Sequence, residues 1–247
     1  MTVEASTSET SYCPVSPLGY GWLPMRLKSA LMSVPLVGRL ALALKHARFG
    51  GSADYWEKRY ATGGNSGAGS YNRLAHFKAD FLNEFVKRHR IASVVEFGSG
   101  DGAQLELADY PDYVGVDISS TILDAVKRRF AADGRIRFLH ASEVPAHLSA
   151  ELALSLDVIY HLVEDDTFDA YMRQLFAAGS RFVIAYSSNA ERPSSSPHVR
   201  HRRFTDWVEA NRPDFRLAAH VPNAFPEDVS DPHNTSYADF YVFERQA

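Results

Sequence analysis

A glycine-rich segment follows a short apolar stretch near the middle of the chain. Residues 92–97 predict a buried strand, and Gly98-Ser99-Gly100-Asp101-Gly102 follows it directly, ahead of a helix pattern from Ala103 to Asp109. Glycines let the backbone of such a turn come close to a ligand, and a helix N-terminus presents free N–H groups. Asp117 follows a second predicted strand, 113–116, where an acid can bind the two hydroxyls of a ribose. The pattern therefore predicts a site for an adenosine-containing cofactor.

Two kinds of adenosine cofactor fit this pattern. Gly98, Gly100 and Ala103 satisfy the loose dinucleotide fingerprint G-x-G-x-x-G/A. Glu96, two residues before the first glycine, can hold the loop and face an amino group, and Gly102 extends the run to G-x-G-x-G. The chain also has no room for a separate hydride-acceptor domain. These details favour S-adenosylmethionine, and a nucleotide-dependent oxidoreductase of Rossmann type is the alternative from another class.

The same segment resembles motif I of the class I S-adenosylmethionine-dependent methyltransferases, and Asp117 stands where that family has its ribose-binding acid. The family usually offers an acid to the adenine amino group after its third strand. Here that acid comes late, at Glu143, so either Ser142 or Glu143 is expected to contact the adenine. With the resemblance, the expected cofactor-binding residues are Glu96, Gly98, Ser99, Gly100, Asp117, Ile118, Ser142, Glu143 and Tyr71.

The order of the predicted elements indicates an α/β fold. Strands are expected at 92–97, 113–116, 136–139, 152–156, 181–186, 215–221 and 238–244. Helices are expected at 74–89, 103–108, 120–132, 166–178 and 205–211, the last of them capped by Thr205. Alternating strands and helices imply a mostly parallel sheet with helices on both faces, and the last two strands suggest an antiparallel edge. This is also the Rossmann-like arrangement of the methyltransferase family.

The N-terminal part of the chain differs from the rest. We expect residues 1–52 to form a tail and a basic amphipathic extension, and 53–247 to form the methyltransferase domain. Residues 1–18 are rich in Ser, Thr and Glu and are predicted to be disordered. The segment 22–48 interleaves leucines with basic residues, which favours helices that pack on the main domain or on a second subunit, with a weak membrane-surface contact as the alternative.

Composition excludes several classes of protein. A net charge of −4 argues against a general nucleic-acid binder. The one cysteine, Cys13, excludes a disulfide framework and a cysteine-rich zinc site. With no basic n-region at Met1–Ser11 and no apolar stretch long enough to span a bilayer, the sequence predicts a soluble cytoplasmic protein.

The residues after the fourth predicted strand are the first candidates for catalysis. The segment Ser155–Leu162 resembles the family motif that runs beneath the reacting methyl group. His161 is the best candidate for a general base, because an unperturbed pKa near 6.5 suits removal of a proton from an acceptor hydroxyl. Asp157 is expected to assist His161, to accept from the acceptor hydroxyl, or to join a metal site with Asp165 or Asp166.

Two further loops are expected near the cofactor. The segment after the fifth strand, 197–204, carries His198 and His201, which are second candidates for the base. The glycine-rich loop 63–70 is predicted to close over the site as a lid.

Four motifs together resemble methyltransferases that modify sugars and polysaccharides, with the methylmannose polysaccharide methyltransferases as one relative. They are W-E-x-R-Y from Trp56, G-G-x-S-G-x-G-S-Y from Gly63, D-V-I-Y-H-L from Asp157 and H-V-R-H-R-x-F-T-x-W from His198. The resemblance implies O-methylation of a saccharide hydroxyl, with or without a divalent metal such as Mg²⁺. Other small-molecule, lipid-linked or protein acceptors remain alternatives, as does a regulator without catalysis. No Asn/Asp-Pro-Pro-Tyr/Phe run follows the fourth strand, which argues against methylation of nucleic-acid bases.

Overall fold

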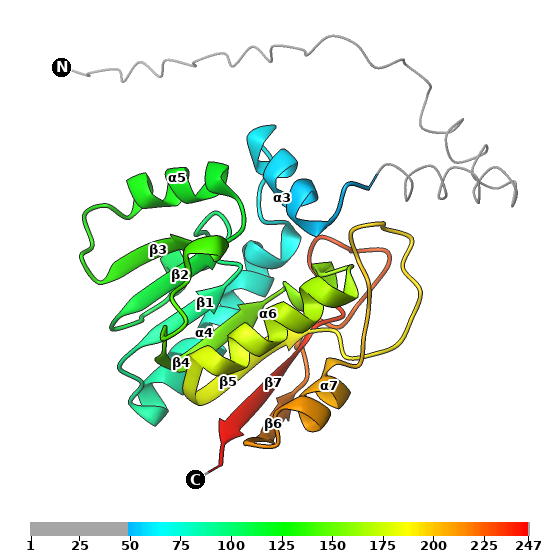
Figure 1. Cartoon of the computed structure of the whole chain (residues 1–247). Coiled ribbons are helices and arrows are strands. Elements are labelled where there is room, and N and C mark those ends of the chain that lie inside the picture. Colours follow the sequence, from blue (N-terminus) through cyan, green and yellow to red (C-terminus); the bar gives the residue numbers. More distant parts are fainter. Residues whose placement is uncertain (1–48, 247) are drawn as a thin grey trace, which may run out of the picture. The chain divides into compact units, whose positions relative to one another are not determined.

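The structure is a computed structural model that describes residues 49–246 (Figure 1). The predictions for the disordered tail, for the basic segment 22–48 and for its contacts with a second subunit or a membrane all lie outside the described residues. No helix in the described part of the chain is both long and apolar enough to cross a membrane.

A seven-stranded sheet forms the centre of the molecule, in the order β3-β2-β1-β4-β5-β7-β6. The strands β1 to β5 pair in parallel, whereas β7 pairs antiparallel with both β5 and β6. This arrangement confirms the predicted fold class and the antiparallel pairing at one edge. The strands are β1 Val94–Phe97, β2 Tyr113–Asp117, β3 Ile136–His140, β4 Ala150–Leu156, β5 Gly179–Ser187, β6 Phe215–Val221 and β7 Asp239–Arg245.

Helices cover both faces of this sheet. α4 (Asn72–His89) and α5 (Ser120–Arg129) pack on one face, whereas α6 (Asp165–Ala178) and α7 (Phe204–Asn211) pack on the other. Figure 1 shows α6 lying across the front of the sheet, and α3 (Ser52–Ala61) above the ends of the strands, next to α5. Each face therefore has its own apolar core. α3 packs on neither face and instead lies over the edge where the parallel strands end.

The apolar stripe of α4 shows how the sequence sets this packing. Phe77, Phe81 and Phe85 are half-buried and pack against the core, as their spacing predicts. The ring of Phe81 stacks on Phe240 of β7 at a centroid distance of 4.2 Å. Lys78 is fully buried on the same helix, which the sequence pattern did not indicate.

The prediction of a helix from Ala103 to Asp109 is wrong. A single 3₁₀ turn, η2 (Leu105–Leu107), stands there instead. Asn83 of α4 explains the difference, because its side-chain amide donates to the Leu107 carbonyl and its oxygen accepts from the Asp109 N–H, both at 2.9 Å. These backbone groups are thus satisfied without a helix. The glycine turn consequently lacks the α-helix N-terminus that the sequence suggested.

The start of α7 also differs from the prediction. The helix begins at Phe204, and Arg203 is its N-cap without a side-chain hydrogen bond. The hydroxyl of Thr205 donates to the side-chain oxygen of Asn189 at 3.1 Å, so it is not available to cap the helix.

Candidate functional site

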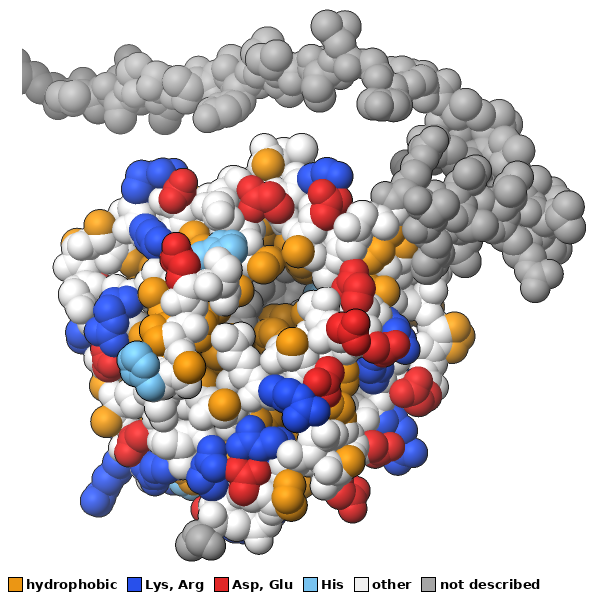
Figure 2. All heavy atoms as spheres, viewed as in Figure 1, with side chains coloured by type: hydrophobic (Ala, Val, Ile, Leu, Met, Phe, Trp, Pro, Cys, Tyr) orange, Lys and Arg blue, Asp and Glu red, His pale blue; other side chains and the backbone are white. Residues whose placement is uncertain are grey.

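A cavity of about 520 Å³ lies beyond the carboxyl ends of β1, β2 and β4, which is within the range typical of small-molecule sites. Figure 2 shows this side of the molecule hollowed, with apolar side chains inside. α3 and the 3₁₀ turn η1 (Ala68–Ser70) contribute lining residues from the N-terminal side. Its apolar lining includes Trp56, Tyr60, Phe97, Val116, Ile118, Leu156, Leu162 and Tyr171.

The glycine turn after β1 borders this cavity and requires its glycines. Gly98, Gly100 and Gly102 have φ values of 82°, 56° and 75°, in the left-handed region that favours glycine. A Cβ atom on Gly98 would overlap the side chain of Val158, and one on Gly100 would overlap Ser66. The packing of this turn against Val158 and Ser66 therefore requires glycine at positions 98 and 100.

Asp117 connects the glycine turn to the end of β2. Its carboxylate accepts from the backbone N–H of Gly100 at 2.9 Å and from that of Ser119 at 3.0 Å. Burial raises the pKa of this carboxyl above its ordinary value. Asp117 and the following Ile118 both line the cavity, where the sequence predicts a ribose-binding acid.

Glu96 reaches the same cavity from β1 and is only 4% exposed. The hydroxyl of Tyr113 donates to its carboxylate at 2.7 Å. Burial raises the pKa of Glu96 to about 7, against the opposing effects of the Tyr113 hydrogen bond and the Lys78 charge. Glu96 is thus a second buried carboxyl group next to the glycine turn.

The predicted lid is held against the glycine turn by Asp101. Ser66 donates its N–H to the Asp101 carboxylate at 2.8 Å, and the Asp101 N–H donates to the Ser66 hydroxyl at 3.0 Å. Tyr71 does not line the cavity; its hydroxyl donates to the same carboxylate at 2.5 Å. Burial raises the pKa of Asp101, but these hydrogen bonds together outweigh it and leave that pKa below its ordinary value.

The segment after β3 places only one of its residues in the cavity. Ala141 lines it, whereas the expected adenine contacts Ser142 and Glu143 are exposed and do not. The hydroxyl of Ser142 lies 2.7 Å from a ring nitrogen of His140. The other ring nitrogen of His140 lies 2.8 Å from the carbonyl oxygen of Ile118, which ties this segment to β2.

Asp157 begins the segment after β4 in an unusual backbone conformation. Its φ of 61° lies in the left-handed region, which costs about 1–2 kcal/mol for a residue with a side chain. Lys78 forms an ion pair with its carboxylate at 2.6 Å, and the Tyr160 hydroxyl donates to the other oxygen at 2.8 Å. Both Asp157 and Lys78 line the cavity. These contacts hold the carboxylate in place at the end of β4.

His161 also lines the cavity, and its ring is oriented by its neighbours. Its Nδ1 lies 2.9 Å from the carbonyl oxygen of His198, so a proton on Nδ1 leaves the lone pair of Nε2 free. The ring packs edge-to-face with Trp56 at 5.0 Å between centroids. Burial lowers the pKa of His161 to about 4, so the ring is neutral at pH 7.

The two rival histidines lie outside the cavity lining. His198 stacks between His161 and Tyr55, at centroid distances of 5.4 and 4.2 Å, and contributes its carbonyl group to His161. His201 is buried with Nδ1 at 2.8 Å from the hydroxyl of Ser188. The structure therefore brings His161 and Asp157 together at the cavity and leaves His198 and His201 in supporting positions.

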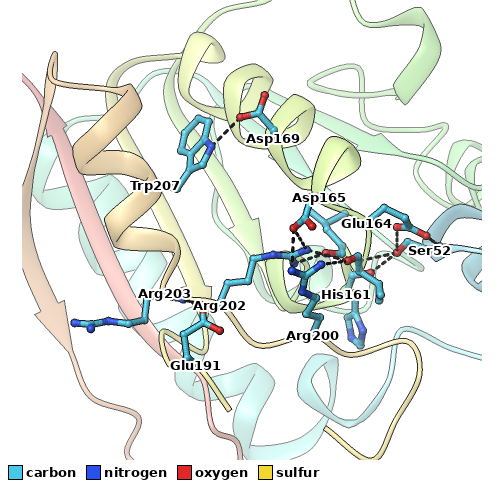
Figure 3. A network of polar contacts seen from close by, with 12 residues as sticks. Ser52, His161, Glu164, Asp165, Asp169, Glu191, Arg200, Arg202, Arg203 and Trp207 are labelled. Carbon is cyan, nitrogen blue, oxygen red and sulfur yellow. Dashed lines mark hydrogen bonds and ion pairs between the residues drawn. The ribbon is translucent and has the colours of Figure 1, made fainter. Parts of the chain in front are cut away.

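Two of the three carboxylates suggested as metal ligands are paired with basic side chains, Asp157 with Lys78 and Asp165 with two arginines. Asp165 pairs with Arg200 at 3.0 Å and with Arg202 at 3.1 Å (Figure 3). Within residues 49–246, no three His, Cys, Asp or Glu side chains are grouped so as to hold a metal ion. The residues present therefore do not fit the suggested Mg²⁺ site.

Ser52 joins α3 to the segment that carries His161, a role that no sequence pattern indicates (Figure 3). Its hydroxyl lies 2.7 Å from both the His161 carbonyl oxygen and the Glu164 carboxylate, and it accepts from the Val163 N–H at 3.0 Å. The Ser52 N–H donates to Glu164 at 2.9 Å. This junction fixes the start of α3, the helix that carries Trp56.

Several solved structures that are similar to this chain are methyltransferases. The methyltransferase domain of the bacterial CtHen1-C aligns with a TM-score of 0.54 and 20% identity over 70% of this chain and 100% of that one. The chain has the fold of the class I S-adenosylmethionine-dependent methyltransferases. Magnesium protoporphyrin IX methyltransferase from Synechocystis PCC 6803, with bound SAM, aligns at a TM-score of 0.52 and 16% identity over 70% of this chain and 81% of its own.

The N-methyltransferase NodS from Bradyrhizobium japonicum WM9, in complex with S-adenosyl-L-homocysteine, has the same methyltransferase fold at a TM-score of 0.55 and 11% identity. The alignment covers 71% of this chain and 87% of NodS. At the level of sequence, no protein-family model and no curated protein matches the chain.

Proposed function

We propose that the cavity binds S-adenosylmethionine and that the chain is a methyltransferase. The charge of the lining carries this proposal. Carboxyl side chains dominate the ionisable groups of the described lining, where Lys78 is the one lysine or arginine; the acids are Glu96, Asp101, Asp117, Asp157 and Asp166. Opposite charges attract strongly in a poorly hydrated site, so such a lining favours a cationic sulfonium and disfavours the pyrophosphate of a dinucleotide.

The sheet topology supports the same choice. Dinucleotide-binding Rossmann domains typically have the strand order 3-2-1-4-5-6 in an open parallel sheet. Here β7 lies between β5 and β6 and runs antiparallel to both. This arrangement, with the acidic lining, makes the oxidoreductase alternative the weaker one.

Each part of the bound cofactor is expected to contact particular residues at the carboxyl ends of the strands. Asp117 accepts hydrogen bonds from the ribose hydroxyls, and the adenine ring lies against Ile118 and Ala141. The turn Gly98–Gly100, with Ser99 at its centre, lets the backbone approach the cofactor, and Glu96 faces its amino group. All of these residues line the cavity, which supports the assignment.

We further propose that the acceptor is a saccharide hydroxyl. When bound, S-adenosylmethionine supplies an electrophilic methyl group on a sulfonium. Nε2 of His161 takes the hydroxyl proton as the new C–O bond forms and the S–C bond breaks, which leaves S-adenosylhomocysteine. Asp157 accepts from a hydroxyl of the acceptor and so orients it, and the Trp56 ring offers an apolar face. The free Nε2 of His161 and the fixed carboxylate of Asp157 support these roles.

Transfer of labelled methyl groups tests this function. The protein is incubated with methyl-labelled S-adenosylmethionine and a panel of mono- and oligosaccharides, beside matched panels of amines, lipid-linked sugars and proteins. We expect label in a saccharide as an alkali-stable methyl ether, and at least about 10²-fold slower labelling with the His161→Ala variant. Label in an amine or a protein would reject the saccharide assignment but keep the methyltransferase. Absence of transfer to every panel, together with no binding of S-adenosylhomocysteine, would reject both.

A further inference from the structure

Gln104 is a buried polar side chain with an unused acceptor at the cavity. It directly precedes η2 and is 8% exposed. Its amide nitrogen donates to the Ala75 carbonyl of α4 at 3.1 Å, whereas its amide oxygen has no donor within the described residues. A buried acceptor without a donor destabilises the folded chain unless a ligand provides the missing hydrogen bond. Because Gln104 lines the cavity, a ligand can supply that donor.

Lys78 offers the opposite chemistry one turn further along α4. Ala75, which holds Gln104, and Lys78 are three residues apart and therefore lie on the same helix face. Lys78 is 1% exposed and lines the cavity. An ammonium group has three N–H donors, of which the Asp157 carboxylate takes one at 2.6 Å. A buried cation that donates further hydrogen bonds suits a carboxylate.

The acceptor of Gln104 and the cation of Lys78 are complementary to a zwitterion, which carries an ammonium and a carboxylate. We propose that Gln104 and Lys78 form the subsite for the α-amino-acid end of the bound cofactor, which rests on the function proposed above. The Gln104 oxygen accepts from the α-ammonium, and Lys78 donates to the α-carboxylate while it keeps its pair with Asp157. Glu96, in the same lining, offers its carboxyl oxygens as further acceptors for the ammonium.

This subsite replaces a helix terminus that the chain lacks. Because η2 is a single 3₁₀ turn, the segment after the glycine turn provides no α-helix dipole for the cofactor's carboxylate. The charge of Lys78, which comes from α4, supplies that attraction instead. The amino-acid end of the cofactor would thus be recognised by side chains from two elements on the same face of the sheet.

Two ligands distinguish binding at this subsite from binding in the rest of the cavity. S-adenosylhomocysteine carries the amino-acid end, whereas 5′-methylthioadenosine has the same adenosine and thioether without it. Calorimetric titrations of both ligands are made with the full chain and its variants Gln104→Met and Gln104→Glu. Gln104→Met keeps the length of the side chain and removes both the acceptor and the donor to Ala75, whereas Gln104→Glu keeps an acceptor and removes only the donor. Thermal unfolding of each ligand-free variant checks the fold.

We expect Gln104→Met to weaken S-adenosylhomocysteine about tenfold or more, the loss of one charge-assisted hydrogen bond, and to leave 5′-methylthioadenosine within about twofold. Gln104→Glu should stay near the wild type for both ligands. Lys78→Met, if it folds, should also weaken only S-adenosylhomocysteine.

Three outcomes would overturn this subsite. The first is an equal loss of affinity for the two ligands, and the second is an unchanged S-adenosylhomocysteine affinity in Gln104→Met. The third is the same ligand affinities in Gln104→Met and Gln104→Glu. Each would mean that Gln104 serves only to hydrogen-bond Ala75. Failure of the proposed function looks different, because the wild-type protein would then bind neither ligand, and the subsite would be rejected with it.

Discussion

The orientation of the His161 ring is compatible with the proposed role of general base. The His198 carbonyl group fixes one ring nitrogen, and Nε2 remains for the acceptor. General-base assistance typically contributes about 10²–10⁴-fold to a rate. We therefore expect His161→Ala to lower turnover of the best saccharide acceptor by at least about 10²-fold, with the affinity for S-adenosylhomocysteine near wild type.

His198 and His201 provide matched controls for this prediction. His198→Ala keeps the main-chain carbonyl that orients His161, and His201 contacts Ser188 away from the cavity. Both variants should retain more activity than His161→Ala. A His161→Ala variant that stays active while His198→Ala or His201→Ala is inactive would move the base to the loop after β5.

The free energy of unfolding in mild acid depends on the protonation of the same histidine. Burial lowers the pKa of folded His161 to about 4, whereas an unfolded histidine titrates near 6.5. The unfolded chain therefore binds this proton first, so His161 lowers stability progressively as the pH falls from about 6.5 to about 4. His161→Gln should flatten this part of the curve in denaturant titrations made at several pH values.

Other groups contribute to that curve, so the variant must be compared with the wild type. His198 and His201 also have lowered pKa values because of burial and act in the same direction. The raised pKa of Glu96, about 7, acts in the opposite direction between about pH 4.5 and 7. Curves of equal slope for His161→Gln and the wild type would show that His161 titrates normally in the folded chain.

At the scale of elements, the predicted lid 63–70, between α3 and α4, is held by a few polar contacts. Ser66 and Asp101 exchange two hydrogen bonds, and Tyr71 adds a third to the same carboxylate. We expect Ser66→Ala to increase amide hydrogen exchange in 63–71 without changing exchange in β1 or β4. Cofactor binding should reduce exchange of the same segment. Equal exchange with and without cofactor would argue against a lid.

The strands were predictable because their residues are buried on both sides. Val94 and Val95 face opposite cores, and the run that contains them ends at a turn that only glycine tolerates. The helix expected after that turn was wrong because Asn83, a residue of another element, satisfies the backbone at 107 and 109. Local periodicity contains no information about such a long-range partner.

The site was predictable where a residue type is tied to a turn, and less so elsewhere. Asp117, Glu96, Gly98 and Gly100 follow from their positions at or near strand ends, and all four line the cavity. Lys78 and Gln104 were missed because polar residues within helical patterns are ordinarily exposed. The pairing of Lys78 with Asp157 joins residues 79 positions apart, and only the folded chain brings them together.

At the scale of the whole molecule, that pair links α4 to the end of β4. Removing one partner of a buried ion pair typically costs about 3–5 kcal/mol, because the other charge is left unpaired. Lys78→Met should therefore lower the free energy of unfolding in urea by about that amount. The double variant Lys78→Met with Asp157→Asn should recover much of the loss. Additive effects of the two substitutions would mean that the pair is not coupled.

The acidic cavity at one edge of the sheet is the basis of the proposed function, and the most direct test is ligand choice. Calorimetric titration of the full chain with S-adenosylmethionine, S-adenosylhomocysteine and NAD compares the two cofactor classes. We predict binding of the first two and none of NAD, with weaker binding of S-adenosylhomocysteine by Asp117→Ala, in which a charge-assisted contact worth about 1.5–3 kcal/mol is lost. Binding of NAD in preference to both, or an unchanged affinity in Asp117→Ala, would contradict the account.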